Sequence, residues 1–418
     1  MTDATTTQPG IKRFIGIDWN VGALKNAGKR YWVFVGILGI LIALGLTAWY
    51  LILTEGGVTM AQRDGFTWGL WFADYMFYVG LAAGGLVVYA SVHLFGAEQF
   101  RPLARLAVLM AGVLTMVALL GDLTDLVRVW RIYWFILSPN LSAIFVYTGS
   151  AAAIYMVLCF VDLWILITGK GGEKLAFAMT LIALPFAIYL HTTTAFVLAL
   201  NKSRELWNTA FMVPIFLTSA VASGIGLLLI VAYIMQRFNV LKFKSSMFRS
   251  LSTLLATTII LDLFLLLVEI AFVYWPTSAK AGHTLRFSEF LTGPYAWVFL
   301  PVLILGITAF SLLASRRTRH IPAVQITASA LYVVAIFFKR YTLMSMGFAI
   351  GTLGQQQAPY LPSLTEAFIA IGLLSIGVLF VTLAAKLLPL RVPEHDEGTS
   401  PELAGQPAEP ALEPEAAQ

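Results

Sequence analysis

Long apolar runs separated by short polar segments dominate the chain. Ten of these runs are long enough to cross a bilayer, because a membrane-spanning helix needs about 20 apolar residues. They cover residues 31–53, 67–95, 103–125, 142–168, 175–200, 210–236, 250–275, 295–315, 321–346 and 364–388. The pattern predicts an all-α integral membrane protein of about ten transmembrane helices, with both chain ends on one side of the membrane.

The basic residues of the connections predict which side that is. Most of the 27 Lys and Arg residues lie in the tails or in connections on the side of the chain ends, as in 101–105, 237–249 and 316–319. Because Lys- and Arg-rich loops stay in the cytoplasm, we expect a cytoplasmic (inner) membrane protein with cytoplasmic N- and C-termini.

The two ends of the chain differ in character. Residues 1–30 are polar and mixed, and they predict a cytoplasmic tail with no cleavable signal peptide. Residues 389–418 are rich in Pro, Glu and Ala, and they predict a disordered, acidic cytoplasmic tail.

Composition narrows the possible partners. The chain is 59% hydrophobic and only 12% charged, whereas soluble domains are about a quarter charged. The net charge of +5 reflects the topology-setting loops, so we expect the lipid bilayer as a partner and no nucleic acid. The outer connections are too short to form a soluble domain, so any large extracytoplasmic machinery must be another polypeptide.

A weak internal repeat suggests how the helices group. GLAAGGL at 80–86 resembles SAVASGI at 219–225, and GDL at 121–123 lies opposite LDL at 261–263. We therefore expect two repeated four-helix bundles, from helices 2–5 (67–205) and helices 6–9 (206–346). The first helix with its outer loop (31–66) and a second outer loop with the last helix (347–388) would be peripheral. The alternative is that membrane helices simply share such small-residue composition.

Ionisable residues inside membrane spans are costly and mark function by default. Asp74, Asp122 and His191 all fall in the outer half of the first bundle, and Tyr78 lies one helical turn from Asp74. Asp74, Tyr78, Asp122 and His191 can all exchange protons, and in the sequence no other such group of residues falls at one predicted depth. His191 is as readily explained as a hydrogen-bonded core histidine.

The segment GDLTDLVRVWRIYW, residues 121–134, ends the third span in a ladder of two acids and two arginines. Asp125 and Arg128 have the spacing of an ion pair on a helix surface, and Trp130 and Trp134 suit the membrane interface. The functional interpretation is that the ladder closes a pocket at the water boundary, with Arg128 holding its acids ionised.

A second group of acids lies in the second bundle. Asp262 and Glu269 are seven residues apart and share a helix face, while Lys339 and Arg340 could compensate their charge. Asp162 and His93 lie toward the cytoplasmic ends of their spans. Together Asp262, Glu269, Asp162 and His93 suggest a proton route, although the acids could also serve only to hold helices together.

Several chemistries are excluded by what the chain lacks. Of five histidines, only His93 and His191 lie in or at the end of spans, and they fall on opposite halves of the membrane. Paired imidazole ligands for haem are therefore not available, and one cysteine, Cys159, cannot ligate an iron–sulfur cluster. We expect no haem, no Fe–S cluster and no bound metal in this chain.

Several segments resemble the NrfD/PsrC family of membrane subunits. These are YMFYVGLAAGGLVVY (75–89), the ladder at 121–134, LSPNLS (137–142), MVPIFLTSAVASGIGLLLI (212–230) and GPYAWVF (293–299). The family includes membrane subunits of polysulfide reductase, certain hydrogenases, menaquinone reductase complexes and alternative complex III. Its usual Asp-Leu-Gly-Arg-Pro is Asp-Leu-Thr-Asp-Leu here (122–126), so Arg128 would have to supply the missing charge.

The resemblance implies a membrane subunit of a respiratory oxidoreductase that binds menaquinone or another exchangeable quinone near the outer face. The predicted site consists of Asp74, Tyr78, Asp122, Arg128 and His191. Electrons would pass to or from an extracytoplasmic iron–sulfur subunit, itself attached to a molybdopterin-type, hydrogenase or multihaem cytochrome subunit. The chain would not be catalytic alone. The alternatives are a secondary transporter with a mid-membrane carboxylate site and a purely structural anchor.

Overall fold

The computed structural model describes residues 11–204, 206–274, 291–349 and 357–391. Its long helices are α2 (Lys29–Glu55), α3 (Leu70–Phe95), α4 (Ala104–Asp125), α6 (Ile144–Thr168), α7 (Gly172–Ala199), α8 (Met212–Arg237), α9 (Ser245–Tyr274), α11 (Ala296–Ala314), α12 (Pro322–Gly347) and α13 (Leu364–Leu387). In the described residues, ten helices are long and apolar enough to cross a membrane. The predicted all-α membrane class and the ten spans are confirmed.

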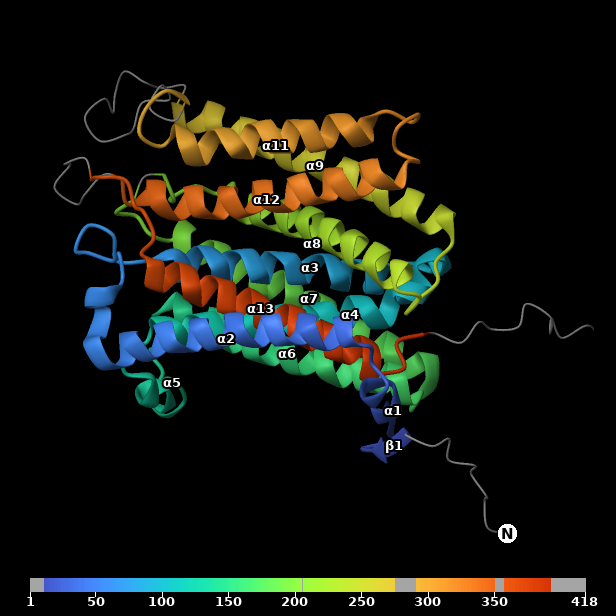
Figure 1. The fold of residues 1–418 in the computed structure, drawn as a ribbon. Helices are drawn as coiled ribbons and strands as arrows, with labels where there is room; N and C mark the ends of the chain where they lie inside the picture. The colour runs from blue at the N-terminus through green and yellow to red at the C-terminus, as the bar shows by residue number, and fades with distance from the viewer. Residues whose placement is uncertain (1–10, 205, 275–290, 350–356, 392–418) are drawn as a thin grey trace, which may run out of the picture.

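The helices lie side by side, as Figure 1 shows. Both described chain ends lie at one end of the array, which we call the terminal end. The opposite end, called the distal end, carries residues 56–69, 126–143 and 357–363. Because the number of membrane-spanning helices is even, both chain ends lie on the same side.

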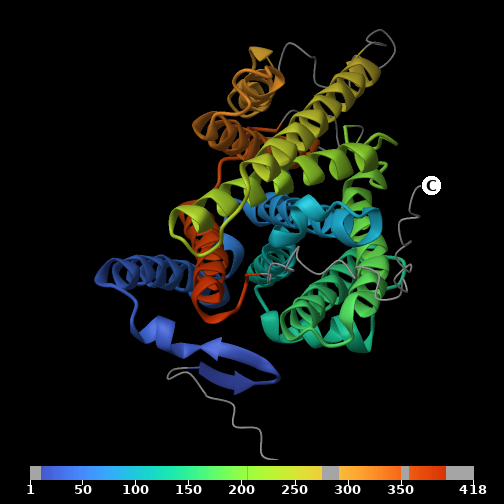
Figure 2. The same cartoon turned by 90° about the vertical axis from the view of Figure 1, so that its right-hand side faces the viewer.

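Neighbouring helices close two rings. In the first, α3 packs on α4, α4 on α6, α6 on α7, and α7 on α3. In the second, α8 packs on α9, α9 on α11, α11 on α12, and α12 on α8. These contacts join the helices into two groups of four, while the two repeated four-helix bundles of the sequence analysis stay a prediction. Figure 2 shows the rings from a second direction.

Helices α3 and α8 form the seam between the rings, where Gly84 meets Gly224. A Cβ atom on Gly84 would lie 2.2 Å from the carbonyl carbon of Gly224, and one on Gly224 would lie 2.4 Å from the Gly84 nitrogen. Two backbones can approach this closely only where both residues lack a side chain. The small-residue segments singled out in the sequence thus lie at this seam.

The first and last long helices pack against each other outside the rings. Helix α13 contacts α2, with Gly45 and Gly372 at their crossing, and it also contacts α4 and α3. This arrangement brings the distal end of α13 next to the first ring. The predicted peripheral helix therefore reaches the region of the predicted quinone site.

Short elements cover the two ends. At the terminal end, β1 (Ile11–Phe14) and β2 (Ile17–Asn20) form an antiparallel hairpin, followed by α1 (Val21–Lys25). The hairpin is held to α6 because Trp164 donates its indole N–H to the Ile15 carbonyl at 2.8 Å. This part of the N-terminal tail is therefore ordered by packing that hydropathy alone did not predict.

The remaining short elements are 3₁₀ turns and one helical turn. They are η1 (Gly56–Thr59), η2 (Glu98–Leu103), η3 (Val129–Tyr133) and α5 (Trp134–Leu137). Residues 392–418 of the predicted disordered tail (389–418), residues 275–290 after α9 and residues 350–356 of the predicted second outer loop lie outside the described residues.

Candidate functional site

The distal end of the first ring holds a group of buried and half-buried acids. Asp74 lies one turn into α3 and is only 4% exposed, and no hydrogen bond or ion pair of its carboxyl is found within the described part of the chain. Tyr78, one turn further along α3, and Glu366, at the start of α13, are its electrostatic neighbours. Asp74 and Tyr78 are thus together, as predicted.

Glu366 is the residue of this group that the sequence reasoning missed. It caps α13 reciprocally with Ser363: the Ser363 hydroxyl accepts from the Glu366 N–H, and Glu366 accepts from the Ser363 N–H at 2.8 Å. The S-x-x-E spacing is a known capping signature that could have located it. Its placement beside Asp74 comes from tertiary packing.

Tyr360 completes the surroundings of Glu366. Its hydroxyl donates to the Glu366 carboxylate at 2.5 Å and accepts the N–H of Leu70 at 2.8 Å. Burial and the nearby Glu366 carboxylate raise the pKa of Tyr360 well above its usual value. The phenol therefore remains a protonated donor, and it ties the start of α13 to the start of α3.

Asp122 lies near the distal end of α4, next to α3. It interacts electrostatically with Asp125 and Tyr75, but no hydrogen bond or ion pair of its carboxyl occurs among the described residues. Asp125 instead accepts a hydrogen bond from the Gln62 amide at 2.7 Å.

Arg128 does not take the place predicted for it. Helix α4 ends at Asp125 because Leu126 adopts an extended conformation, so Asp125 and Arg128 are no longer on one helix face. Arg128 is exposed, and no ion pair joins it to either acid in the residues described. The predicted ion pair is wrong, while a role for Arg128 in quinone binding is untested.

His191 is buried between α7 and α3. Its Nδ1 lies 2.7 Å from the Ala187 carbonyl oxygen, and its Nε2 lies 3.0 Å from the Val79 carbonyl oxygen. A neutral imidazole donates from one nitrogen only, so both contacts are hydrogen bonds only in the doubly protonated ring. A ligand would reach this ring only by replacing one of the two carbonyls.

The second ring contains a buried ion pair. Lys339 Nζ lies 2.6 Å from Asp262 Oδ1, and the two side chains are 4% and 2% exposed. Tyr332 donates to the other carboxylate oxygen at 2.8 Å, and the Thr218 hydroxyl lies 3.4 Å from Oδ1. The compensation by Lys339 that the sequence suggested is therefore present.

Arg340 is fully buried at the seam between the rings. One guanidinium nitrogen donates to the Ser219 hydroxyl at 2.6 Å, and the guanidinium stacks over Phe216 at 3.9 Å from the ring centre. Nε and Nη1 have no hydrogen-bond partner within the described residues. Within the described residues, the second ring thus carries two adjacent buried cations, Lys339 and Arg340, and one acid in direct contact with them, Asp262.

The other residues of the predicted proton route fall in two places. Glu269 lies in the distal half of α9, where the Thr209 hydroxyl is 3.5 Å from its carboxylate. Asp162 lies near the terminal end of the first ring and accepts the Tyr89 hydroxyl at 2.8 Å, and the ring of His93 packs 4.4 Å from that of Tyr89.

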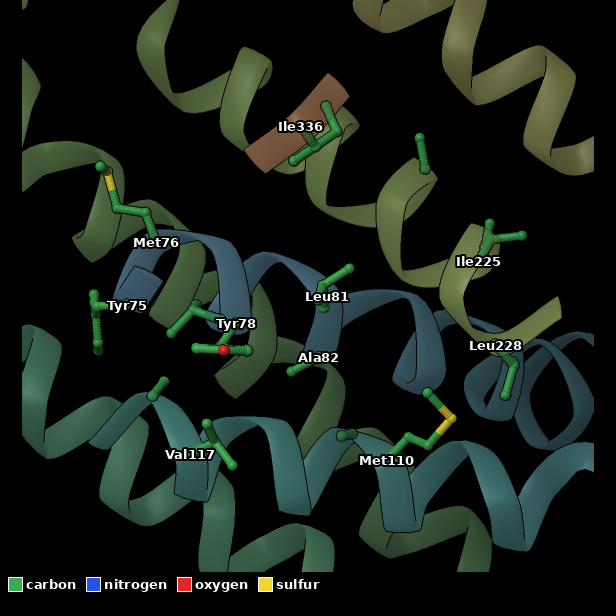
Figure 3. Close-up of a cluster of buried hydrophobic side chains, with 14 of the residues drawn as sticks. Tyr75, Met76, Tyr78, Leu81, Ala82, Met110, Val117, Ile225, Leu228 and Ile336 are labelled. Carbon is green, nitrogen blue, oxygen red and sulfur yellow. The ribbon is translucent and has the colours of Figure 1, made fainter. Parts of the chain in front are cut away.

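Apolar side chains lie between α3 and α4 on the terminal side of Tyr78. Figure 3 shows Ala82 and Met110 there, with Val117 of α4 beside Tyr78 and Leu81 on the side of α3 away from α4, and all four are buried. They lie along the first ring between the distal acids and Asp162. The structure therefore gathers the predicted residues into separate polar clusters rather than one continuous chain of hydrogen bonds.

The acids Asp74 and Asp122, which are unpaired within the described part of the chain, lie with the buried phenol of Tyr78 in an apolar core, and we call these three residues with Glu366 the distal cluster. Such a set can exchange protons with a ligand or accept hydrogen bonds from it. Within the described residues, no three His, Cys, Asp or Glu side chains are grouped as ligands for a metal ion.

Comparison with known proteins identifies the family. The family described as "Polysulphide reductase, NrfD" matches residues 58–351. A putative membrane subunit of dimethyl sulfoxide reductase from Halobacterium salinarum is 29% identical, over 86% of this chain and 91% of its own. An Hdr-like menaquinol oxidoreductase integral membrane subunit of Archaeoglobus fulgidus is 26% identical, over 89% and 96%. A selenate reductase subunit of Mesobacillus selenatarsenatis is 23% identical, over 86% and 94%. The chain belongs to the NrfD family of integral membrane proteins.

Proposed function

We propose that the chain is the quinone-reactive membrane subunit of a respiratory oxidoreductase, with its quinone site at the distal end of the first ring. The names of its relatives support the class, since one is a menaquinol oxidoreductase subunit and another a menaquinone reductase subunit. The chain itself would not be catalytic without its partners.

The observation that carries the proposal is a pair of acids, buried Asp74 and half-buried Asp122, whose carboxyls have no hydrogen-bond or ion-pair partner among the described residues. Burying a carboxylate without a partner is strongly unfavourable, so such a group must be protonated or satisfied by a ligand. Reduction of a quinone takes up two electrons and two protons, and oxidation of the quinol releases them. Two carboxyls beside an apolar core meet that requirement.

Each residue then has a distinct role. Asp74 and Asp122 hold or accept the exchanged protons, and the Tyr78 hydroxyl offers a hydrogen bond to a quinone oxygen. His191 fixes α7 against α3 and reaches the ligand if its contact with Val79 opens. Arg128, exposed beyond the end of α4, contributes positive charge at the mouth of the site.

The residue assignment is tested by quinone turnover in the purified complex. A positioned acid or base contributes about 10²–10⁴-fold to a rate, so Asp122→Asn is expected to lower turnover by about 100-fold. Asp64→Asn, at an exposed acid in a distal loop, is the matched control and should leave the rate unchanged. Full activity in both Asp122→Asn and His191→Ala would overturn the assignment.

We also propose that electrons pass between the quinone and an extracytoplasmic iron–sulfur subunit bound at the distal end. The described connections there are short segments without a domain of their own, at residues 56–69, 126–143 and 357–363. The relatives are named as subunits of dimethyl sulfoxide reductase, selenate reductase and hydrogenase, which supports a further molybdopterin-type, hydrogenase or multihaem cytochrome subunit.

Affinity purification through a C-terminal tag tests the partner. The expected result is a complex that contains an iron–sulfur polypeptide, whereas an active, stable chain without any partner contradicts the proposal. Fusion of alkaline phosphatase or a fluorescent protein to the C-terminus tests the orientation in the inner membrane. We expect fluorescence without phosphatase activity, as for a cytoplasmic terminus.

Proton movement coupled to quinone turnover is the third part of the proposal. Asp262, Glu269, Asp162 and His93 are the residues proposed to carry it. The Lys339 contact favours a structural role for Asp262, so the reconstituted complex must decide. If Glu269→Gln and Asp262→Asn leave turnover and membrane-potential generation unchanged, the second ring is scaffold.

The buried ion pair at mid-membrane also suits a secondary transporter, the alternative function. A transporter would move its solute in liposomes that contain this chain alone. Solute flux without partners, together with no response to quinone, would replace the proposed function.

A further inference from the structure

The second ring contains a cleft that the proposed quinone site does not use. It lies among the distal halves of α8, α9, α11 and α12 and has a cavity volume of about 90 Å³. Most of its walls are apolar, from Met212, Ile215, Leu266, Phe299, Val302 and Leu343. Ligand sites for small molecules have mostly apolar walls with a few polar groups among them.

Two charged side chains line this apolar cleft from different helices. Glu269 comes from α9, and Lys339 comes from α12. Lys339 uses one N–H on Asp262, at 2.6 Å, and an ammonium group has three to donate. Among the described residues, Glu269 has one long contact, with Thr209 at 3.5 Å. Among the described residues, Lys339 therefore has N–H groups left to donate and Glu269 has carboxylate oxygens left to accept, between apolar walls.

The position of the cleft indicates what can enter it. Glu269, Leu266 and Ile270 on α9 are partly buried, whereas Leu267 on the neighbouring face is 63% exposed on the outside of a membrane-spanning helix. A ligand that enters here from the bilayer must be lipid-soluble. A hydrocarbon chain alone would leave the remaining hydrogen-bonding groups of Lys339 and Glu269 without partners, which is costly in an apolar site.

We propose that this cleft binds the headgroup of a second quinone-type molecule, with a ring carbonyl facing Lys339 and a ring hydroxyl or carbonyl facing Glu269. The planar ring would lie among the apolar side chains of α8, α9 and α11, with the buried indole of Trp207 also lining the cleft. The inference goes beyond the proposed function. It concerns a separate site for a quinone-type ligand, and it holds whether or not the first ring binds quinone.

The test uses an azido-1,4-naphthoquinone with a short prenyl tail, as a photoaffinity probe on the full-length chain in lipid nanodiscs. Labelled peptides are mapped by mass spectrometry, and affinity is measured from the concentration dependence of labelling. We expect saturable labelling of α9 or α12 in the stretches that line the cleft. Leu266→Trp, which fills the cleft, should weaken that labelling by about tenfold or more, a change of about 1.4 kcal/mol.

Leu267→Trp is the matched control because it adds the same indole on the lipid-facing side, and it should label like the wild type. Val302→Trp fills the cleft from α11 and replaces Leu266→Trp if that variant fails to fold. Glu269→Gln removes the carboxyl without changing the shape, and it should weaken labelling as well.

Three results would overturn the inference. They are no labelling of the second ring, labelling that Leu266→Trp and Val302→Trp leave unchanged, and equal competition by a prenyl hydrocarbon without a headgroup. Failure of the proposed function gives a different result. In that case the probe labels the second ring and not the first, and Asp122→Asn does not change the labelling of either ring.

Discussion

The buried pair of Asp262 and Lys339 makes an asymmetric prediction about stability. Asp262→Asn leaves Lys339 and Arg340 buried with no carboxylate in contact. Lys339→Met leaves Asp262 with the Tyr332 hydroxyl at 2.8 Å, the Thr218 hydroxyl at 3.4 Å and the field of Arg340. We therefore expect Asp262→Asn to destabilise the protein more than Lys339→Met.

The magnitude follows from the geometry. At 2.6 Å and an effective dielectric constant of about 20, the attraction between the two charges is about 6 kcal/mol. The cost of removing both charges from water offsets much of this, so the pair adds little net stability. Removing one partner costs about 3–5 kcal/mol because it leaves a buried charge without its counterion. The double variant Asp262→Asn/Lys339→Met should therefore be more stable than Asp262→Asn.

The protein carries its own reporter for the assay. Cys159 is the one cysteine of the chain and is 1% exposed, so a thiol-reactive fluorophore reacts only when the protein opens. Thermal ramps in detergent, with size-exclusion profiles of heated samples, give the order of stability of the variants. Thr257→Val, at an exposed position on α9, is the control. A larger loss for Lys339→Met, or a double variant whose loss is the sum of the single losses, would refute the reasoning.

Two further predictions concern packing. Gly84→Ala places a Cβ 2.2 Å from the backbone of α8 and should lower the stability of the protein by about 1–3 kcal/mol or prevent assembly. A Cβ at Gly80 meets nothing closer than 3.7 Å, so Gly80→Ala should be tolerated, and thermal ramps of both variants check this. Tyr360→Phe leaves the buried Glu366 carboxylate without its 2.5 Å donor and should cost about 1–3 kcal/mol, against no change for Tyr133→Phe at an exposed tyrosine, by the same assay.

The helices could be predicted from the sequence because the bilayer imposes a length and a composition on each one. The predicted span 103–125 corresponds to α4 (Ala104–Asp125), and the predicted span 364–388 to α13 (Leu364–Leu387). Counting residues along the helices predicts that Asp74 and Asp122 share one depth, and the structure places both toward the distal ends of their helices, α3 and α4.

The remaining features depend on backbone geometry and on contacts between distant segments. The ion pair of Asp125 with Arg128 required helix to continue past Leu126, and hydropathy does not register that break. Glu366 enters the distal cluster from a helix more than 200 residues away from α4 in the sequence. The two carbonyl contacts of His191 depend on how α7 packs against α3, which a residue type and its depth do not determine.

The proposed partner and orientation depend on assembly rather than on this chain's own packing. Lys and Arg in the loops predict the orientation, and family membership supports a partner subunit. Co-purification tests the partner, and the terminal fusions test the orientation.

Equilibrium binding of a naphthoquinone to the purified complex tests the central claim most directly. The measurement is made in nanodiscs and corrected for empty nanodiscs, with the wild type, Asp122→Asn and the control Asp64→Asn compared at equal protein. We predict saturable binding in the wild type and in Asp64→Asn, and loss of one binding site in Asp122→Asn. Binding no greater than that of empty nanodiscs, or binding that is the same in all three proteins, would contradict a quinone site among the distal acids of the first ring.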